Sequence, residues 1–309
     1  MSGFLEQTDG GEYRHSKFSR AYRLDEPGPG HMFLACYDHV LSPFHNFVEY
    51  LSQRGQLPSN AREPDDPLHS PMTHHYNQDG VSPWSTMEQN PERMRDFQFA
   101  MDTLGEALPV VGTFDFRLLR NEGLDESRGR VQLVDVGGGH GTVLGGVLAA
   151  YGGSSLRPET CVLQDRPGVV ELSRRNRALP DAVQRMNHDF FTDQPVKGAK
   201  AYLMRAIIHD WPDAACVKIL THLAAAMAPD SRVLICDPVL PPRLGEDNFF
   251  IAIVDHAVMA LAGKERTEKA FSDLLDQAGL ELVRVWRVSG GAQIGACVEG
   301  RLKRQSSRL

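Results

Sequence analysis

The stretch that decides the fold runs from Val134 to Thr142 and reads V-D-V-G-G-G-H-G-T. Residues 130–136, which end inside this stretch, carry branched apolar side chains that predict a buried strand. Glycines at 137, 139 and 141 allow a sharp turn and let a ligand approach the backbone closely. A helix is predicted directly after the turn, at residues 142–151. Strand, glycine-rich turn and helix in this order predict a ligand-binding turn in a parallel α/β sheet.

The spacing of these glycines departs from the nicotinamide dinucleotide fingerprint. That fingerprint is G-x-G-x-x-G, whereas here Thr142 stands three positions after Gly139. An acidic residue, Asp135, precedes the turn within the strand. The next predicted strand ends in Asp165, and a carboxylate there would accept hydrogen bonds from ribose hydroxyls. The alternative is a glycine-rich turn that only packs, but the acidic strand end favours a ligand site.

The chain beyond residue 130 alternates between strands and helices. Further strands are predicted at residues 161–165, 199–205, 232–237, 280–287 and 293–299, and further helices at 168–178, 213–227, 249–261 and 268–278. This alternation predicts an α/β fold with a doubly wound, mostly parallel sheet. The two consecutive strands at the end predict an antiparallel edge.

The first third of the chain has a different character. Residues 1–90 are rich in proline, histidine and aromatic residues. A helix is predicted over residues 33–51 despite Pro43, and another begins at Pro91. Several prolines between residues 57 and 79 predict a long irregular connection. We therefore predict a mainly helical region at 1–105 and a ligand-binding domain at 106–309.

The composition of the chain argues against several classes of function. The chain has 309 residues and a net charge of -7, and without a long basic run it is a poor candidate for binding nucleic acid. No apolar run approaches the roughly 18 residues of a membrane span, and the start lacks a secretory signal. Five widely spaced cysteines favour a reduced, cytoplasmic protein. No metal is expected, because His74-His75 alone is weak evidence for a metal site.

Four segments resemble the plant and fungal small-molecule O-methyltransferases of the caffeic acid type, which are class I enzymes dependent on S-adenosylmethionine (SAM). They are residues 133–141, M-R-A-I-I-H-D-W at 204–211, V-L-I-C-D-P-V-L-P at 233–241 and G-K-E-R-T at 263–267. Their order and spacing match the family from about residue 90 to 300. The resemblance implies a Rossmann-like sheet, SAM as cofactor, and methyl transfer to a phenolic hydroxyl of an aromatic or polyketide-like small molecule.

The resemblance also assigns residues to the cofactor. Asp165 would hold the ribose, Asp189 would reach the adenine amino group, and Phe190 would pack on the adenine ring. Arg205 stands where the family has Lys or Arg near the cofactor. The full set implied is Asp135, Gly137, Gly139, Asp165, Asp189, Phe190 and Arg205.

His209 is the catalytic base that the resemblance implies. Asp237, where plant relatives have Glu, and Glu265 would be its acidic partners. The chemistry agrees, because a phenol must lose its proton as it attacks and a histidine with a carboxylate neighbour can take it. In the alternative reading, His209 packs against Trp211 at a helix start, Asp237 caps a turn and Glu265 pairs with a neighbouring arginine.

The substrate side rests on apolar residues that the family would use to clamp an aromatic acceptor. The candidates are Met32, Phe33, Tyr37, Trp84, Met94, Phe97, Met101, Phe249 and Met259, with His74, His75, Tyr76 and Asn77 in the irregular segment. Most of the apolar ones could equally be core residues.

The family carries a winged-helix dimerisation module before its catalytic domain. Only twelve residues precede residues 13–22, which resemble the end of that module. The resemblance thus implies that residues 1–105 are a remnant of the module plus a helical substrate-cap region, and that residues 106–309 are the SAM-binding catalytic domain. A homodimer is therefore in doubt. Two further functions stay open: a SAM-binding protein that catalyses a pericyclic or isomerisation step without methyl transfer, and an inactive regulatory subunit.

Overall fold

The computed structural model describes residues 3–25, 28–56, 62–104, 108–127, 129–153, 155–177, 179–246, 249–288 and 295–303. The chain forms two compact units. The helical unit comprises residues 1–107 and 256–262, and the sheet unit comprises residues 108–255 and 263–309. Parts of three predicted segments, at residues 57–61, 178 and 293–294, lie outside the described residues.

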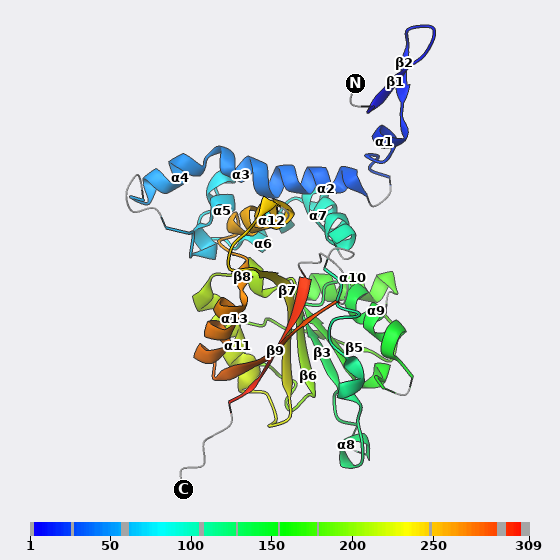
Figure 1. Ribbon diagram of the computed structural model, residues 1–309, viewed down its shortest axis with the longest axis vertical. Helices are drawn as coiled ribbons and strands as arrows, with labels where there is room; N and C mark the ends of the chain where they lie inside the picture. Colours follow the sequence, from blue (N-terminus) through cyan, green and yellow to red (C-terminus); the bar gives the residue numbers. More distant parts are fainter. Residues whose placement is uncertain are drawn as a thin grey trace. The chain divides into compact units, whose positions relative to one another are not determined.

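The sheet unit is built on one twisted sheet with the strand order β5-β4-β3-β6-β7-β10-β9 (Figure 1). The parallel strands are β3 (Leu133–Val136), β4 (Cys161–Asp165), β5 (Gln184–Asn187), β6 (Ala201–Arg205) and β7 (Arg232–Leu240). Strands β10 (Gly295–Leu302) and β9 (Leu280–Arg287) are antiparallel, and the short β8 (Arg266–Thr267) pairs with the end of β7. The predicted doubly wound sheet with an antiparallel edge is confirmed.

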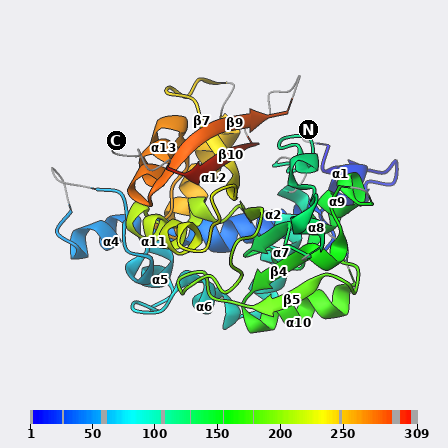
Figure 2. The ribbon, with the colours of Figure 1, turned by 90° about the horizontal axis from the view of Figure 1, so that it is seen from below.

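Helices flank this sheet. They are α9 (Thr142–Tyr151), α10 (Pro167–Asn176), α11 (Asp213–Ala224) and α13 (Glu268–Gln277). The sheet unit also contains the short helix α8 (Leu124–Ser127) and the 3₁₀ turns η3 (Phe116–Leu119), η4 (Pro158–Thr160) and η5 (Ile208–Asp210). Figures 1 and 2 both show α11 and α13 side by side, away from α9 and α10. Helix α13 begins where the Thr267 side chain accepts the Ala270 N–H, as expected of an N-cap residue.

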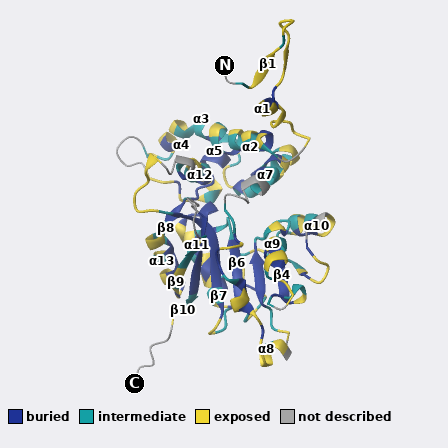
Figure 3. Cartoon of the chain, turned by 45° about the vertical axis from the view of Figure 1, so that its right-hand side comes forward, coloured by how far each residue is buried: buried dark blue, intermediate teal, exposed yellow. Residues whose placement is uncertain are grey.

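The core of the sheet unit lies along its central strands. Every residue of β3 is buried, and β4 and β6 are buried up to their last residue. Figure 3 shows these strands in the buried colour along most of their length. Parallel strands are covered by helices on both faces, which explains why their sequences are continuous apolar runs rather than alternating patterns.

Strand β3 is the topological switch point of the sheet. Its neighbours β4 and β6 lie on opposite sides of it, and the chain winds outward from β3 in both directions. Ligands of doubly wound sheets bind beyond the carboxyl ends of the strands at such a point. The loops after β3, β4 and β6 therefore mark where a site is expected.

Two features of the sheet differ from the sequence prediction. Strand β5 is absent from that prediction, because Gln184 to Asn187 is a polar, partly exposed edge strand without an apolar pattern. Strand β7 continues through Pro238 to Leu240 rather than ending at Asp237. Pairing of β7 with β6 stops at Cys236, so the missing N–H of Pro238 costs no hydrogen bond to β6.

The helical unit is mainly helical, as predicted. Its elements are the hairpin β1 (Leu5–Gln7) and β2 (Tyr13–His15), then α1 (Lys17–Arg20), α2 (Pro29–Cys36), the π-helical turn η1 (Tyr37–Leu41), α3 (Ser42–His45), α4 (Phe47–Gln53), η2 (Pro67–His69), α5 (Pro71–His75), α6 (Pro83–Glu88) and α7 (Pro91–Leu104). Helix α12 (Phe249–Met259) starts in the sheet unit, and its last residues belong to the helical unit. Across the described ranges, no helix is long and apolar enough to cross a membrane.

The predicted helix over residues 33–51 is broken into four parts. The break centres on Pro43, which has no N–H to continue the α-helical ladder. The chain responds with the π-helical turn, in which the Ser42 N–H donates to the Tyr37 carbonyl five residues earlier. The extra residue in that turn lets the helical rod continue into α3 and α4.

Candidate cofactor and catalytic site

The glycine loop between β3 and α9 has the conformation that its sequence predicts. Gly137, Gly139 and Gly141 all have left-handed backbone angles. A Cβ on Gly137 would lie 2.7 Å from Cδ1 of Ile207, so a larger residue there would displace the end of that side chain. A Cβ on Gly139 would meet nothing within 4 Å. The loop is thus packed at Gly137 and open at Gly139.

Asp165 closes this loop onto the end of β4. Its Oδ2 accepts the Gly139 N–H at 2.8 Å, and its Oδ1 accepts the Arg166 N–H at 2.7 Å. Burial raises the pKa of Asp165, although both backbone N–H groups favour the charged carboxylate. Each carboxylate oxygen keeps a second lone pair for another donor, such as a hydroxyl of a ligand.

Asp135 lies in β3, two residues before the loop, and only 1% of it is exposed. Burial, together with the charge of Asp165, raises the pKa of Asp135 to about 7, while Arg205 at the end of β6 opposes this. Within the described ranges its Oδ2 has no hydrogen-bond partner. A buried acceptor of this kind calls for a donor, which a ligand in the loop could provide.

The segment after β5 brings Phe190 to the glycine loop. Cε1 of Phe190 lies 3.6 Å from the position a Cβ of Gly137 would take, and its ring centroid is 5.9 Å from that of Trp211. Asp189 is exposed, and its Oδ1 accepts the Phe191 N–H at 3.0 Å. In the described structure, Asp189 therefore stabilises the turn that presents Phe190.

The loop after β6 carries His209 in the η5 turn. The loop starts at Ala206, whose φ of 52° is left-handed and unfavourable for a residue other than glycine. The next residue, Ile207, fills the space beside Gly137. The His209 loop and the glycine loop therefore pack on each other, as adjacent strands at the switch point require.

Three carboxylates surround His209, which is 7% exposed. Its Nδ1 lies 2.8 Å from Oε1 of Glu265, and its Nε2 lies 3.5 Å from Oδ1 of Asp210. The backbone N–H of His209 donates to Oδ2 of Asp237 at 3.1 Å. Glu265 thus holds the ring and Asp237 holds the main chain. Sequence reasoning connects Asp210 only with a helix start, and the signal it misses is the adjacency of Asp210 to His209 on a short turn.

Burial and the mutual charges of His209, Asp210 and Glu265 shift the pKa values of all three groups. Burial by itself lowers the pKa of His209, but Glu265, Asp210 and Asp237 outweigh burial and raise it to about 10. Burial and the neighbouring carboxylates raise the pKa of Asp210 to about 7, against the attraction of His209. Burial likewise raises the pKa of Glu265. All three shifts favour retention of protons, because several buried carboxylates share one imidazole.

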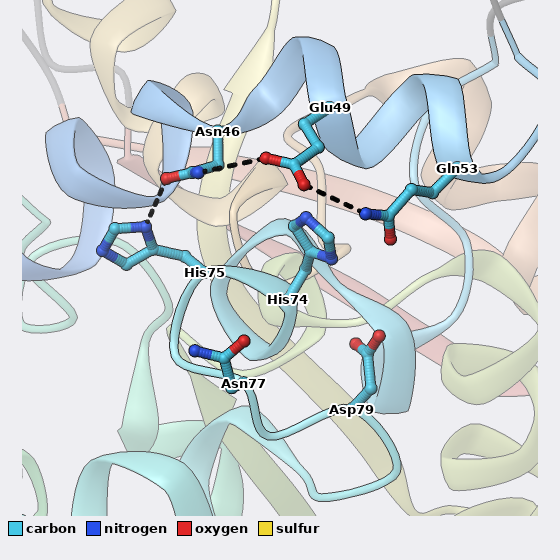
Figure 4. Close-up of a pocket in the computed structure, with 7 residues that line it drawn as sticks. All are labelled: Asn46, Glu49, Gln53, His74, His75, Asn77 and Asp79. Atoms are coloured by element: carbon cyan, nitrogen blue, oxygen red, sulfur yellow. Dashed lines mark hydrogen bonds between the residues drawn. The ribbon is translucent and has the colours of Figure 1, made fainter.

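The helical unit has a polar pocket of its own, with a volume of about 450 Å³ (Figure 4). It is lined by Asn46, Glu49, Gln53, His74, His75, Asn77 and Asp79. Figure 4 shows a chain of hydrogen bonds along one wall, from His75 through Asn46 and Glu49 to Gln53. Three of the four predicted polar substrate-side candidates, His74, His75 and Asn77, thus line one pocket. The fourth, Tyr76, donates its hydroxyl to the Asp38 carbonyl.

The apolar substrate-side candidates are scattered. Trp84, Met94 and Phe97 pack against a buried cluster of Met72, Met87 and Leu261. These three candidates are therefore core residues of the helical unit. Phe33 and Tyr37 are exposed, whereas Met32, Met101 and Met259 are half-buried. The side chain of Phe249 lies outside the described residues. Among the side chains that the structure describes, no group of three or more His, Cys, Asp or Glu residues could hold a metal ion.

Residues 66–281 match the family model described as an O-methyltransferase domain. The O-methyltransferase hmp5 of Hypomyces subiculosus is 37% identical over 83% of this chain and 61% of its own length. The O-methyltransferase kntB of Aspergillus niger is 34% identical over 94% of this chain and 67% of its own length. The chain therefore spans about two thirds of the length of these relatives.

Solved structures agree with these matches. OxaC, in complex with sinefungin and meleagrin, is 29% identical with a TM-score of 0.82, covering 98% of this chain and 73% of OxaC. A single-residue variant of LepI, in complex with S-adenosylhomocysteine (SAH) and a substrate analogue, is 25% identical with a TM-score of 0.81, covering 97% of this chain and 73% of LepI. The family match covers most of the chain, including the glycine loop, His209 and Glu265. This protein belongs to the O-methyltransferase domain family.

Proposed function

We propose that this protein is a SAM-dependent O-methyltransferase that methylates a phenolic hydroxyl of an aromatic or polyketide-like small molecule, with His209 as the general base. The observation that carries the proposal is the contact between Nδ1 of His209 and Glu265, made on a loop that packs against the glycine loop. The site joins a proton acceptor to a nucleoside-type cradle at the switch point of the sheet.

The residues at the glycine loop fit the cofactor. The open backbone at Gly139 leaves room for a close approach, and Asp165 beside it has lone pairs for ribose hydroxyls. Asp135 offers a buried oxygen that lacks a partner in the described part of the chain, and Phe190 offers a ring face at Gly137. When bound, SAM supplies an electrophilic methyl group on a sulfonium. The OxaC complex with sinefungin and the LepI complex with SAH support this assignment.

His209 is arranged to take the phenolic proton. Glu265 lies beside Nδ1 and favours the tautomer with the proton on that atom, so in the neutral ring Nε2 is the acceptor. Glu265 stabilises the imidazolium that forms, while Asp237 fixes the main chain beneath the ring. A phenol has an ordinary pKa of about 10, close to that of His209. The raised pKa strengthens the His209 ring as a base for a phenol.

The test uses isotope-labelled SAM and a panel of phenols, with products followed by mass spectrometry. A product heavier by one labelled methyl group is expected, and His209→Ala should lower turnover by roughly 10² or more. His222→Ala is the matched control, because His222 also pairs with a carboxylate, Asp193, but on the surface. Full activity in His209→Ala would remove His209 as the base.

A second candidate is a step without methyl transfer, such as a pericyclic reaction or an isomerisation. The observation that favours it is the raised pKa of His209, because a ring that holds its proton at neutral pH can act as a donor rather than a base. One neighbour, described as a pericyclic reaction enzyme, is 24% identical with a TM-score of 0.79 and supports only the fold.

The same assay separates these functions. Methyl transfer consumes labelled SAM, whereas the second candidate gives an isomeric product with SAM unchanged. SAM binding by calorimetry, with no turnover of a substrate that an active homologue converts, would instead indicate an inactive regulatory subunit.

A further inference from the structure

Arg266 is a buried cation beside the catalytic loop that neither the cofactor nor the base assignment uses. It is 2% exposed and directly follows Glu265. Its Nη1 donates to the Ile208 carbonyl at 2.9 Å, and its Nη2 donates to the Trp211 carbonyl at 2.7 Å. These two carbonyls lie on either side of His209. One guanidinium therefore spans the turn that carries the proposed base.

A carboxylate fixes the orientation of this guanidinium. Nε and Nη2 of Arg266 lie 3.0 and 2.7 Å from Oδ1 of Asp213, the first residue of α11. Nη1 also donates to the Lys264 carbonyl at 3.2 Å. A planar fork with five N–H donors can satisfy such a set at once, whereas an ammonium cannot reproduce its geometry.

The backbone just before Arg266 also contacts the η5 turn. The Lys264 N–H donates to the His209 carbonyl at 2.9 Å. A Cβ on Gly263 would lie only 2.2 Å from that carbonyl oxygen. The segment 263–266 therefore lies directly on the η5 turn and holds the carbonyls of residues 208, 209 and 211.

The η5 turn needs such support because its approach is strained. Ala206 has a φ of 52°, and a left-handed backbone is unfavourable for a residue with a Cβ. Strained positions of this kind persist only where surrounding contacts over-determine them. Hydrogen bonds from Lys264 and Arg266 supply those contacts on the far side of the turn.

We infer that Arg266 is a positioning residue, which clamps the carbonyls of Ile208 and Trp211 so that the His209 ring stays against Glu265. This inference rests on the proposed function, because it takes His209 as the base. Arg266 touches neither reacting atom. Its action passes through the main chain of η5 to the imidazole and through residue 265 to the carboxylate.

The competing view makes Arg266 purely structural, an ion pair that ties α11 to β8. Both views expect Arg266→Lys to lower the thermal midpoint. The two views differ in what they expect of the His209 ring. Only the positioning role predicts that Arg266→Lys weakens the hydrogen bond between His209 and Glu265. That bond helps to raise the pKa of His209, so a loosened ring should titrate at lower pH.

The experiment compares Arg266→Lys with Arg232→Lys. Arg232 is the matched control, because it is a largely buried arginine paired with a carboxylate, Glu299, at 2.9 Å. Arg266→Lys should lower kcat by roughly 10- to 10²-fold, as a misplaced catalytic group does, with the KM for SAM nearly unchanged. Imidazole NMR on ¹⁵N-histidine-labelled protein, assigned with His209→Ala, should show the His209 titration moving to lower pH. Arg232→Lys should lose thermal stability without either change.

A second variant covers the case in which Arg266→Lys does not fold. Asp213→Glu keeps the charge but displaces the carboxylate that orients the guanidinium, so it should move the His209 titration in the same direction by a smaller amount. An unmoved titration and unchanged kcat in the folded variants would overturn the inference. The NMR readout needs no turnover, so a moved titration in a protein that transfers no methyl would leave the clamp standing and reject the proposed function.

Discussion

Oε1 of Glu265 lies 2.8 Å from Nδ1 of His209, although 56 positions separate the two residues along the chain. The contact exists because the loop after β6 and the segment before β8 meet above the end of β7. The sheet thus sets the distance between the proposed base and its carboxylate.

Glu265→Gln should move the pH dependence of methyl transfer to lower pH. In the native protein kcat/KM should rise with pH towards the His209 pKa of about 10, because only the neutral ring accepts a proton. Removing the Glu265 charge should lower that pKa by about 1–3 units. Rate measurements from roughly pH 6 to 10.5 with one phenol check this, since ionisation of the phenol itself is common to both proteins. An unmoved limb would show that Glu265 does not act on the ring.

The same pKa makes a prediction about stability. The pKa of His209 is raised above its ordinary value of 6.5, so its stabilising contribution is complete below pH 6.5 and is lost as the pH rises towards about 10. The difference in free energy of unfolding between the native protein and His209→Ala should therefore shrink over that range. Urea titrations at several pH values measure it, and a difference that grows with pH would contradict the assignment.

Alanine at Gly137 and at Gly139 should have different effects. Both glycines have left-handed backbones, but of the two only Gly137 would press an added Cβ against a neighbour, the Ile207 side chain. Gly137→Ala should therefore lower both the thermal midpoint and SAM affinity. Gly139→Ala should affect stability less, yet still weaken SAM binding by calorimetry, because its Cβ would enter the space proposed for the cofactor. Native SAM affinity in Gly139→Ala would place the cofactor elsewhere.

Gly263→Ala should displace the loop that carries His209. The added Cβ would lie 2.2 Å from the His209 carbonyl oxygen and 2.7 Å from the Asp210 carbonyl carbon, so the main chain of η5 must move. Turnover should fall by roughly 10²-fold, the scale expected for a misplaced base. Gly245→Ala is the control, because a Cβ there meets nothing within 4 Å. Equal activity in the two variants would refute the close packing.

Glu299→Gln should weaken the antiparallel edge of the sheet without touching the site. The buried Glu299 bridges Arg232 and Arg301 through Oε1 and accepts the Trp286 indole N–H through Oε2. Leaving two arginines without their carboxylate should cost about 3 kcal/mol of unfolding free energy. Glu281→Gln, at an exposed position of β9, should cost little. Chemical denaturation of both variants decides the comparison.

Much of the sheet could be predicted from the sequence. The bounds of β4, α9 and β9 match the structure, because each is a run of one period with clear turn signals at its ends. Strand β5 could not be predicted, since its residues are polar and only the neighbouring β4 makes them a strand. The roles assigned to residues 1–105, as substrate cap, and to residues 106–309, as cofactor-binding domain, stay predictions.

The site could be predicted only as far as local patterns reach. Residue type and order along the chain indicate the glycine loop and His209. The contacts of Asp237 with the His209 main chain, of Asp210 with the ring and of Arg266 with two carbonyls depend on how β7 and β8 pass the η5 turn. No spacing in one sequence encodes such three-dimensional proximity.

The π-helical turn at Tyr37–Leu41 carries an evolutionary consequence. One extra residue in an ordinary α-helix would rotate everything after it by about 100°, whereas a π-helical turn absorbs the insertion locally. A homologue one residue shorter between positions 37 and 41 should therefore keep the polar residues of α4 in the same orientation. Sequence alignments of this family should accordingly place single-residue gaps at this turn without disturbing the positions that follow.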